Sequence, residues 1–130
     1  MAHAPLVITG SYAPQDVTFL LKHVQIAPTD IAHKERLIQS GAAHYSEMIS
    51  EERRPDARYM EIFETARAAG VNRIAREICT MARQIAQRIT QGTLPQQITL
   101  CSLVRAGVPY GVLLQRELTT LGVNSCHFGI

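Results

Sequence analysis

A loop with an arginine and a glycine is the stretch whose residue types best suit chemistry. Arg105-Ala106-Gly107 follows an apolar run from Ile98 to Val104 and precedes a second apolar segment. The N–H groups at the start of a helix lack partners and carry partial positive charge, and Arg105 adds a full charge. The candidate phosphate or pyrophosphate ligands are Arg105, Ala106, Gly107, Val108 and Gly111. The alternative is an ordinary strand-to-helix connection with a solvated arginine.

A second group of reactive side chains lies earlier in the chain. His44, Tyr45, Ser46 and Glu47 combine an acid, a base and hydroxyls within four positions. Such a set suits a hood over a substrate, or an acceptor site. The competing interpretation is a polar loop in which the histidine caps a helix.

A cysteine with a histidine base would be the third kind of site, as in thiol hydrolases. The thiols are Cys79, Cys101 and Cys126, and the bases considered are His44 and His127. Cys79 falls near the apolar face of a long helix and Cys101 inside an apolar strand, and buried cysteines are usually inert. Cys126 and His127 are adjacent in a strand, so their side chains are expected on opposite faces. The cysteines show no metal-binding spacing.

The elements that would position the loop form a parallel β-α-β unit over residues 97–130. The run 98–104 lacks alternation, which predicts a strand buried on both faces. Pro109 suits the first turn of a helix, and the apolar spacing that follows supports that helix. A second strand is expected over 125–130.

Residues 1–92 are expected to be mainly helical. The patterns predict a short strand over 6–9 and helices over 14–22, 30–39, 55–69 and 71–90. Thr29 or Asp30 is expected to cap the second of these helices, with Ile31, Leu37 and Ile38 inward, and Gly70 to end the third. Residues 42–55 are the least regular.

Composition indicates one α/β domain of 130 residues with enough apolar content, 46%, for a core. The formal net charge of +2 is too small to argue for binding to nucleic acid or a membrane surface. Three widely separated cysteines favour a reduced, cytoplasmic compartment. Because the sequence stops inside an expected strand, we expect an incomplete domain. Its open sheet edge would invite pairing into a homo-oligomer.

The segment Leu103-Val104-Arg105-Ala106-Gly107, with Ser125-Cys126-His127-Phe128-Gly129-Ile130 after it, resembles the pyrophosphate-loop region of type I phosphoribosyltransferases. A narrower resemblance covers residues 12–130. Three blocks carry it. The first is Tyr12 to Lys22, and the third is Leu103 to Leu114. The second consists of Ile38 to Gly41, His44 to Met48, Glu51 and Pro55. In that order they are similar to a bacterial phosphoribosyltransferase-like family linked to tellurium-resistance gene clusters. The family also goes by the name cysteine protease StiP.

The resemblance implies a type I phosphoribosyltransferase-like fold and a stress-associated role. It also implies a phosphorylated small molecule as ligand, phosphoribosyl pyrophosphate (PRPP) with Mg²⁺. The acidic PRPP motif of that fold is missing, since the one acidic pair, Glu51-Glu52, precedes Arg53-Arg54 rather than a small-residue loop. We therefore expect glycosyltransferase activity only if further sequence completes the fold. The alternatives are a cysteine protease, as the family name suggests, or a non-catalytic binding subunit.

Overall fold

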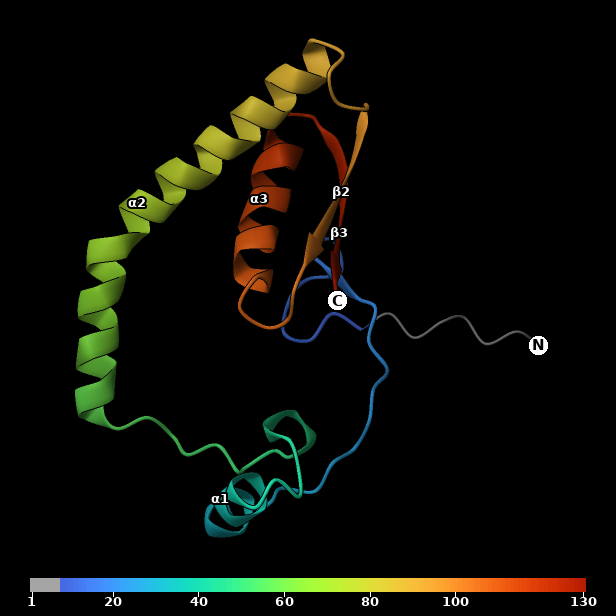
Figure 1. Ribbon diagram of the computed structural model, residues 1–130. Coiled ribbons are helices and arrows are strands. Elements are labelled where there is room, and N and C mark those ends of the chain that lie inside the picture. Colours follow the sequence, from blue (N-terminus) through green and yellow to red (C-terminus); the bar gives the residue numbers. More distant parts are fainter. Residues whose placement is uncertain (1–7) are drawn as a thin grey trace. The chain divides into compact units, whose positions relative to one another are not determined.

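The computed structural model describes residues 8–130, with Ser46 described by its backbone alone, and it has α/β architecture (Figure 1). The elements follow in the order β1 (Thr18–Phe19), α1 (Ile31–Gln39), a 3₁₀ turn η1 (Tyr45–Glu47), α2 (Ala57–Thr90), β2 (Gln97–Ser102), α3 (Val108–Thr120) and β3 (Asn124–Gly129). The predicted β-α-β unit is therefore present at the end of the chain. No helix within residues 8–130 is long and apolar enough to cross a membrane.

The sheet of the described chain is parallel, with the strand order β1-β3-β2. Strand β3 pairs with β2 from Gln97↔Asn124 to Ser102↔Gly129. On its other side, β3 pairs with β1 only at Phe128 and Gly129. The carboxyl ends of β2 and β3 consequently lie together at one edge of the sheet. There β2 continues into the loop that leads to α3.

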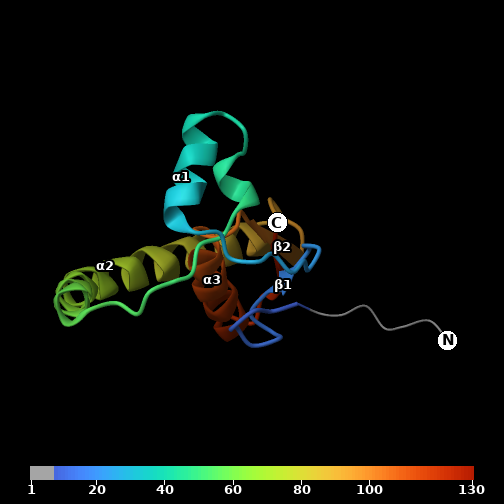
Figure 2. The same ribbon diagram turned by 90° about the horizontal axis from the view of Figure 1, so that it is seen from below.

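Helix α3 lies between the strands and the later part of α2 (Figures 1 and 2). One buried cluster joins Val17 to Val108 and Val112 of α3. A second joins Ala82 of α2 to Leu114 and Leu118, with Leu100 of β2 packed against it. The core is therefore built around α3.

The prediction that β2 is buried on both faces is wrong. Thr99 and Cys101 are exposed, whereas Leu100 packs against the α3 cluster and Ser102 is buried. Because side chains alternate along a strand, this pattern means that α3 covers one face of β2 and leaves the other open.

The predicted helix over 14–22 is also wrong. Residues 14–16 form turns, and Thr18–Phe19 forms strand β1. The Phe19 N–H donates to the Ile8 carbonyl at 2.8 Å, and the Leu20 N–H donates to Gly129 at 2.9 Å. Pairing with distant residues thus overrides the local helical pattern. In the predicted strand over 6–9, Ile8 makes an isolated bridge to Phe19, while Leu6 and Val7 lie outside the described residues.

Helix α2 runs without interruption through Gly70, which we expected to end a helix. An interior glycine costs about 1 kcal/mol relative to alanine, and the alanines and arginines around it favour continuation. The apolar face predicted over 55–69 does not become buried: Tyr59, Ile62 and Phe63 are exposed.

Helix α1 begins where the sequence predicts. The Asp30 carboxylate accepts a hydrogen bond from the His33 N–H at 3.1 Å, and Gly41 follows the helix with a φ of 72°. The predicted inward side chains are wrong, because α1 has no buried residue and both Ile31 and Ile38 are exposed.

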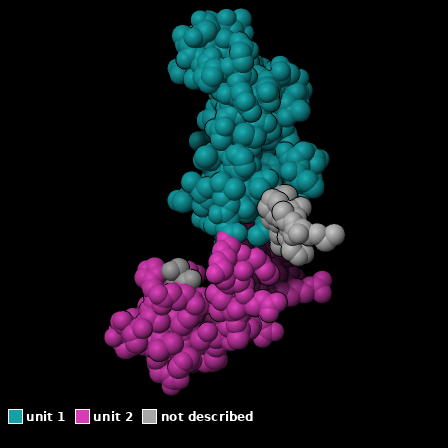
Figure 3. All heavy atoms as spheres, turned by 90° about the vertical axis from the view of Figure 1, so that its right-hand side faces the viewer, with its two compact units in different colours: residues 1–21, 66–130 teal, residues 22–65 magenta. Residues whose placement is uncertain are grey.

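The chain divides into two compact units (Figure 3). The first consists of residues 1–21 and 66–130, and it contains the sheet, α3 and residues 66–90 of α2. The second consists of residues 22–65, with α1, η1 and the first residues of α2.

Candidate functional site

The carboxyl ends of β2 and β3 bring a serine and a histidine together. His127 Nε2 lies 2.7 Å from Ser102 Oγ, and both side chains are buried on the face that α3 covers. The strand register explains the contact, because Ser102 pairs with Gly129, and His127 stands two residues before it on the same face. The result is a hydroxyl hydrogen-bonded to a possible base.

The other ring nitrogen of His127 is held by the backbone. Nδ1 lies 2.8 Å from the carbonyl oxygen of Asp16. A carbonyl oxygen only accepts, so Nδ1 carries the proton that bridges them. In the neutral ring Nε2 is then the acceptor, and the Ser102 hydroxyl donates to it.

Asp16 is fixed in its turn by an ion pair. The Arg116 guanidinium of α3 donates to the two Asp16 carboxylate oxygens at 2.8 and 2.6 Å. The Ala13 N–H also donates to this carboxylate at 3.2 Å. The hydrogen bond from Arg116 is the main cause that lowers the pKa of Asp16 below its ordinary value of 3.8. The segment that carries the Asp16 carbonyl is therefore tied to α3.

Gly111 allows α3 to lie directly over the serine and histidine. A Cβ at this position would stand 2.3 Å from both His127 Nε2 and Ser102 Oγ. No side chain fits at that separation. Gly111, one of the predicted anion ligands, thus lies directly over the Ser102–His127 pair.

A cavity of about 420 Å³ adjoins Ser102 within the first unit. Its lining residues come from β2, from the start of α3 and from one side of α2, and they are mainly apolar: Ile74, Ile78, Met81, Leu100, Tyr110 and Leu114. Ser102, Gly107 and Gly111 also line it, as do Cys101 and one charged residue, Glu77. The serine is therefore buried against α3 but borders an apolar space.

Of the predicted anion ligands, Arg105, Ala106 and Gly107 lie in the loop before α3, and Val108 and Gly111 lie in the first turns of α3. Arg105 and Ala106 are exposed between β2 and α3. The Gly107 N–H donates to the Leu103 carbonyl at 3.0 Å, and the Val108 N–H donates to the Arg105 carbonyl at 3.2 Å. These two N–H groups thus have acceptors inside the loop, and the Val108 side chain belongs to the core. Arg105 is the member of the set best placed to meet an anion.

The second predicted group lies in the second unit, around η1. The Glu47 carboxylate accepts from the His44 N–H at 3.1 Å, and the Glu47 N–H donates to the His44 carbonyl at 3.0 Å. Tyr45 is exposed, and the Lys34 ammonium lies 4.4 Å from the centre of its ring. These contacts build a local turn, whose backbone includes Ser46.

The three cysteines are free thiols, and they lie away from the His127 ring. Cys101 is exposed and, like Thr99, belongs to the face of β2 opposite Ser102. Cys126 Sγ lies 3.5 Å from Thr99 Oγ1, so Cys126 and His127 face opposite sides as predicted. Cys101 was expected to be buried, and its exposure corrects that expectation.

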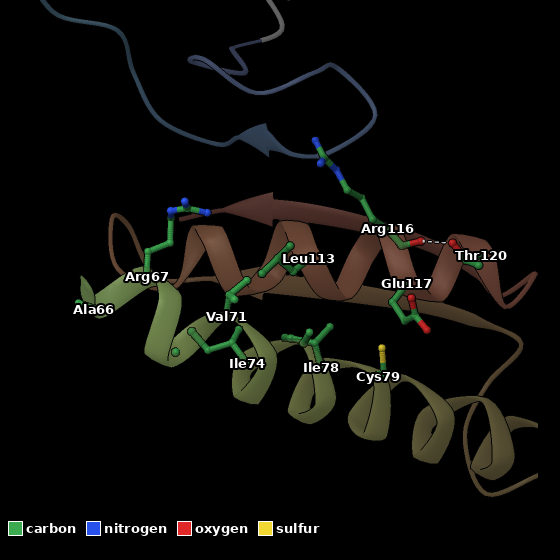
Figure 4. Close-up of a pocket in the computed structure, with 12 residues that line it drawn as sticks. Ala66, Arg67, Val71, Ile74, Ile78, Cys79, Leu113, Arg116, Glu117 and Thr120 are labelled. Atoms are coloured by element: carbon green, nitrogen blue, oxygen red, sulfur yellow. Dashed lines mark hydrogen bonds between the residues drawn. The ribbon is translucent and has the colours of Figure 1, made fainter. Parts of the chain in front are cut away.

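Cys79 lines a groove of about 480 Å³ between α2 and α3, within the first unit (Figure 4). Apolar side chains such as Val71, Ile74 and Leu113 form most of its wall, and Figure 4 shows Cys79 and Glu117 on facing helices. None of the histidines that the structure describes lines this groove. The structure therefore assembles the serine with His127, and none of the thiols.

A metal site in the protein would need several donor side chains close together. Within residues 8–130 there is no group of three or more His, Cys, Asp or Glu side chains that could hold a metal ion. The loop 103–107 contains no carboxylate. The residues present thus do not form a protein site for the Mg²⁺ that the phosphoribosyltransferase resemblance implies.

Sequence reasoning missed Ser102, Asp16 and Arg116. Ser102 was visible as the polar residue that ends an apolar strand, and His127 occupies the corresponding end of the next parallel strand. The carboxyl ends of adjacent parallel strands share one edge, which was the available signal. No local pattern indicated Asp16, which meets Arg116 one hundred positions later.

The comparisons with known proteins agree on one family. Residues 10–130 match the family described as tellurite-like stress resistance cysteine protease StiP. The cysteine protease StiP of Acinetobacter baylyi is 48% identical over 122 residues, which cover 94% of this chain and 30% of that relative. The chain therefore spans less than a third of the relative's length.

No solved structure matches the chain. The family's description concerns a protease and does not support the expected phosphoribosyltransferase. With nearly its whole length matched, the chain belongs to the StiP family of tellurite-like stress resistance proteins.

Proposed function

We propose that this chain is part of a stress-associated peptidase that acts through a thiol. The family description and the name of the relative from Acinetobacter baylyi support this proposal. The observation in the structure that carries it is Cys101, a free and exposed thiol that lines the cavity of about 420 Å³. A cytoplasmic location belongs to the same proposal, because all three cysteines are free.

In such a reaction a thiolate attacks the peptide carbonyl carbon, and a base carries the thiol proton to the leaving amine. Cys101 is the most exposed of the three thiols, and reactive cysteines are at least partly exposed. It lies on the opposite face of β2 from His127, so in this proposal another base takes the Cys101 proton. We therefore assign Cys101 as the first thiol to test.

The test is hydrolysis of a fluorescently quenched peptide library by the purified chain, before and after treatment with iodoacetamide. We expect alkylation to abolish hydrolysis, Cys101→Ala to reduce it at least 100-fold, and Cys79→Ala to change it little. Activity that survives both alkylation and the replacement of all three cysteines would refute a thiol mechanism.

A second candidate function is binding of pyrophosphate or PRPP at the loop 103–107, as in a phosphoribosyltransferase-like protein. Exposed Arg105 at the carboxyl ends of parallel strands favours it. In this proposal Arg105 stabilises the charge that builds on departing pyrophosphate, while the Ala106 backbone lies beside it. Mg²⁺ would arrive with the PRPP, since the loop offers it no carboxylate.

This candidate is tested by titrating pyrophosphate and PRPP into the labelled chain, with and without Mg²⁺, while backbone amide shifts are recorded. Saturable shifts at residues 105–111 that disappear in Arg105→Ala are expected. Arg83→Ala, which removes an exposed arginine from α2, is the matched control and should keep them. A dispersed spectrum that does not respond would refute anion binding by this loop.

A further inference from the structure

The Ser102–His127 pair and the cavity beside it indicate an activity that the thiol mechanism does not use. We propose that Ser102 is a nucleophile in its own right, with His127 as its base. Its substrates would be small esters or other activated acyl compounds whose acyl group is short and apolar. This inference rests on the contacts of the pair and stands whether or not a cysteine in the chain is catalytic.

The geometry is that of an activated nucleophile. Such a site needs a hydroxyl within hydrogen-bond reach of a base, and a third group that orients the base. Here the hydroxyl-to-base distance is 2.7 Å and the base-to-orienter distance is 2.8 Å. The Asp16 carbonyl has the role of orienter and leaves Nε2 as the acceptor of the Ser102 proton. Asp16 is in turn fixed by Arg116, so the tautomer is determined by contacts with two separate segments.

The surroundings determine what can reach the serine. On the side of α3, Gly111 closes the space over both reacting atoms. The opening is the cavity of about 420 Å³, and Ser102 is 8% exposed. Ile78, Leu100 and Leu114 line that cavity together with Glu77, so it favours an apolar group over an anionic one. Its volume suits a short acyl chain.

The proposed step balances as follows. Ser102 Oγ bonds to the carbonyl carbon of the ester, and its proton passes to His127 Nε2. The bond from carbon to the leaving oxygen breaks, and that oxygen takes the proton from Nε2 as the alcohol departs. Water then attacks the acyl-serine with the same base, which releases the acid and restores the hydroxyl. No oxidant, metal or cofactor is required.

The first test uses the whole 130-residue chain with diisopropyl fluorophosphate, which phosphorylates activated serines with loss of fluoride. Peptide mass spectrometry should locate the adduct on Ser102, and Ser102→Ala should lose it. Ser125→Ala is the matched control, because Ser125 Oγ is a buried hydroxyl of the same sheet without a hydrogen-bond partner, and it should be labelled like the unaltered chain. An adduct that is absent from Ser102 in the folded chain would overturn the proposal.

The second test asks whether His127 acts as the base. The release of p-nitrophenol from p-nitrophenyl butyrate should show a burst, and His127→Gln should slow it about 100-fold or more while circular dichroism confirms the fold. Equal rates in both proteins would assign the pair a purely structural role.

The third test separates this site from the thiol mechanism and probes the cavity. Cys101→Ala should leave the labelling of Ser102 in place, although it would abolish a peptidase that acts through Cys101. Met81→Trp adds bulk to the lining of the cavity and should slow the butyrate ester more than the acetate ester. Loss of Ser102 labelling in Cys101→Ala, or equal effects on both esters, would contradict the assignment.

Discussion

Gly111 sets the distance between α3 and the two strands at the level of a single residue. Any side chain there must displace His127 Nε2 and Ser102 Oγ, which stand 2.3 Å from the position of a Cβ. Gly111→Ala should therefore lower the free energy of unfolding by about 1–3 kcal/mol, as overpacking does, despite the roughly 1 kcal/mol that alanine gains in a helix. Urea unfolding followed by circular dichroism measures this change.

Asp16 links stability to pH. Its pKa lies below the ordinary 3.8 because Arg116 donates a hydrogen bond to the carboxylate. A lowered pKa in the folded state stabilises the fold above the ordinary value, and this contribution is lost as the pH falls through the lowered value. Asp16→Asn should therefore be less stable than the unaltered chain at pH 7, and the difference should shrink toward pH 3.

Asparagine keeps the backbone carbonyl that holds His127, so the experiment isolates the carboxylate. Urea midpoints at pH 7 and pH 3 give the comparison, and Arg116→Met supplies the second side of a double-mutant cycle. A constant gap between the two proteins across this range would contradict the assignment of the pH dependence to the Asp16–Arg116 pair.

The sequence predicted the loop but not the site that lies behind it. Arg105 and Gly107 were recognisable because a strand, a glycine and a helix start are local signals. His127 was considered as a base for a thiol, and its partner proved to be Ser102. The Asp16 contacts depend on residues about one hundred positions apart, which no local pattern can register.

Helix α2 shows, at the level of elements, that a glycine need not end a helix. Gly70 lies inside Ala57–Thr90, and a Cβ added there meets nothing within 4 Å. Gly70→Ala should therefore raise the free energy of unfolding by about 0.5–1 kcal/mol, because alanine loses less backbone entropy in a helix. It is also the matched control for Gly111→Ala, since the two helical glycines should respond with opposite signs. A loss of stability at Gly70 would mean that the helix is interrupted there.

The predictions from sequence failed for elements whose structure depends on distant residues. Residues 14–22 have helix-compatible spacing, yet β3 recruits Thr18 and Phe19 into the sheet. The pairing depends on the glycine at position 129, because a Cβ there would stand 2.4 Å from the Phe19 ring. By contrast, the positions of α3 and β2 along the chain were predicted well, although the burial of β2 was not, since their apolar runs are long and bounded by glycine, proline or polar residues.

Burial is distributed unequally over the whole molecule. The buried residues, including Val17, Ala82, Leu118 and His127, belong to the first unit. In residues 22–65, no side chain that the structure describes is buried. Composition alone indicated one domain with one core, because it records how much apolar surface a chain has but not where that surface is covered.

This difference predicts which part of the chain opens first. Regions with few buried contacts open with small free energies, so amides of residues 22–65 should exchange with deuterium faster than those of β2, β3 and α3. Trypsin should cleave first in this unit, for example after Arg53, which is exposed, whereas Pro55 protects the bond after Arg54. Hydrogen-exchange mass spectrometry gives the rates, and Arg53→Gln should remove the cut at this position without changing exchange in the sheet. If residues 22–65 were instead protected as strongly as β3, they would have to be covered by a partner, such as a second copy of the chain. The exposed apolar side chains of Tyr59, Ile62 and Phe63 would then be the first to examine, and dilution should restore their exchange.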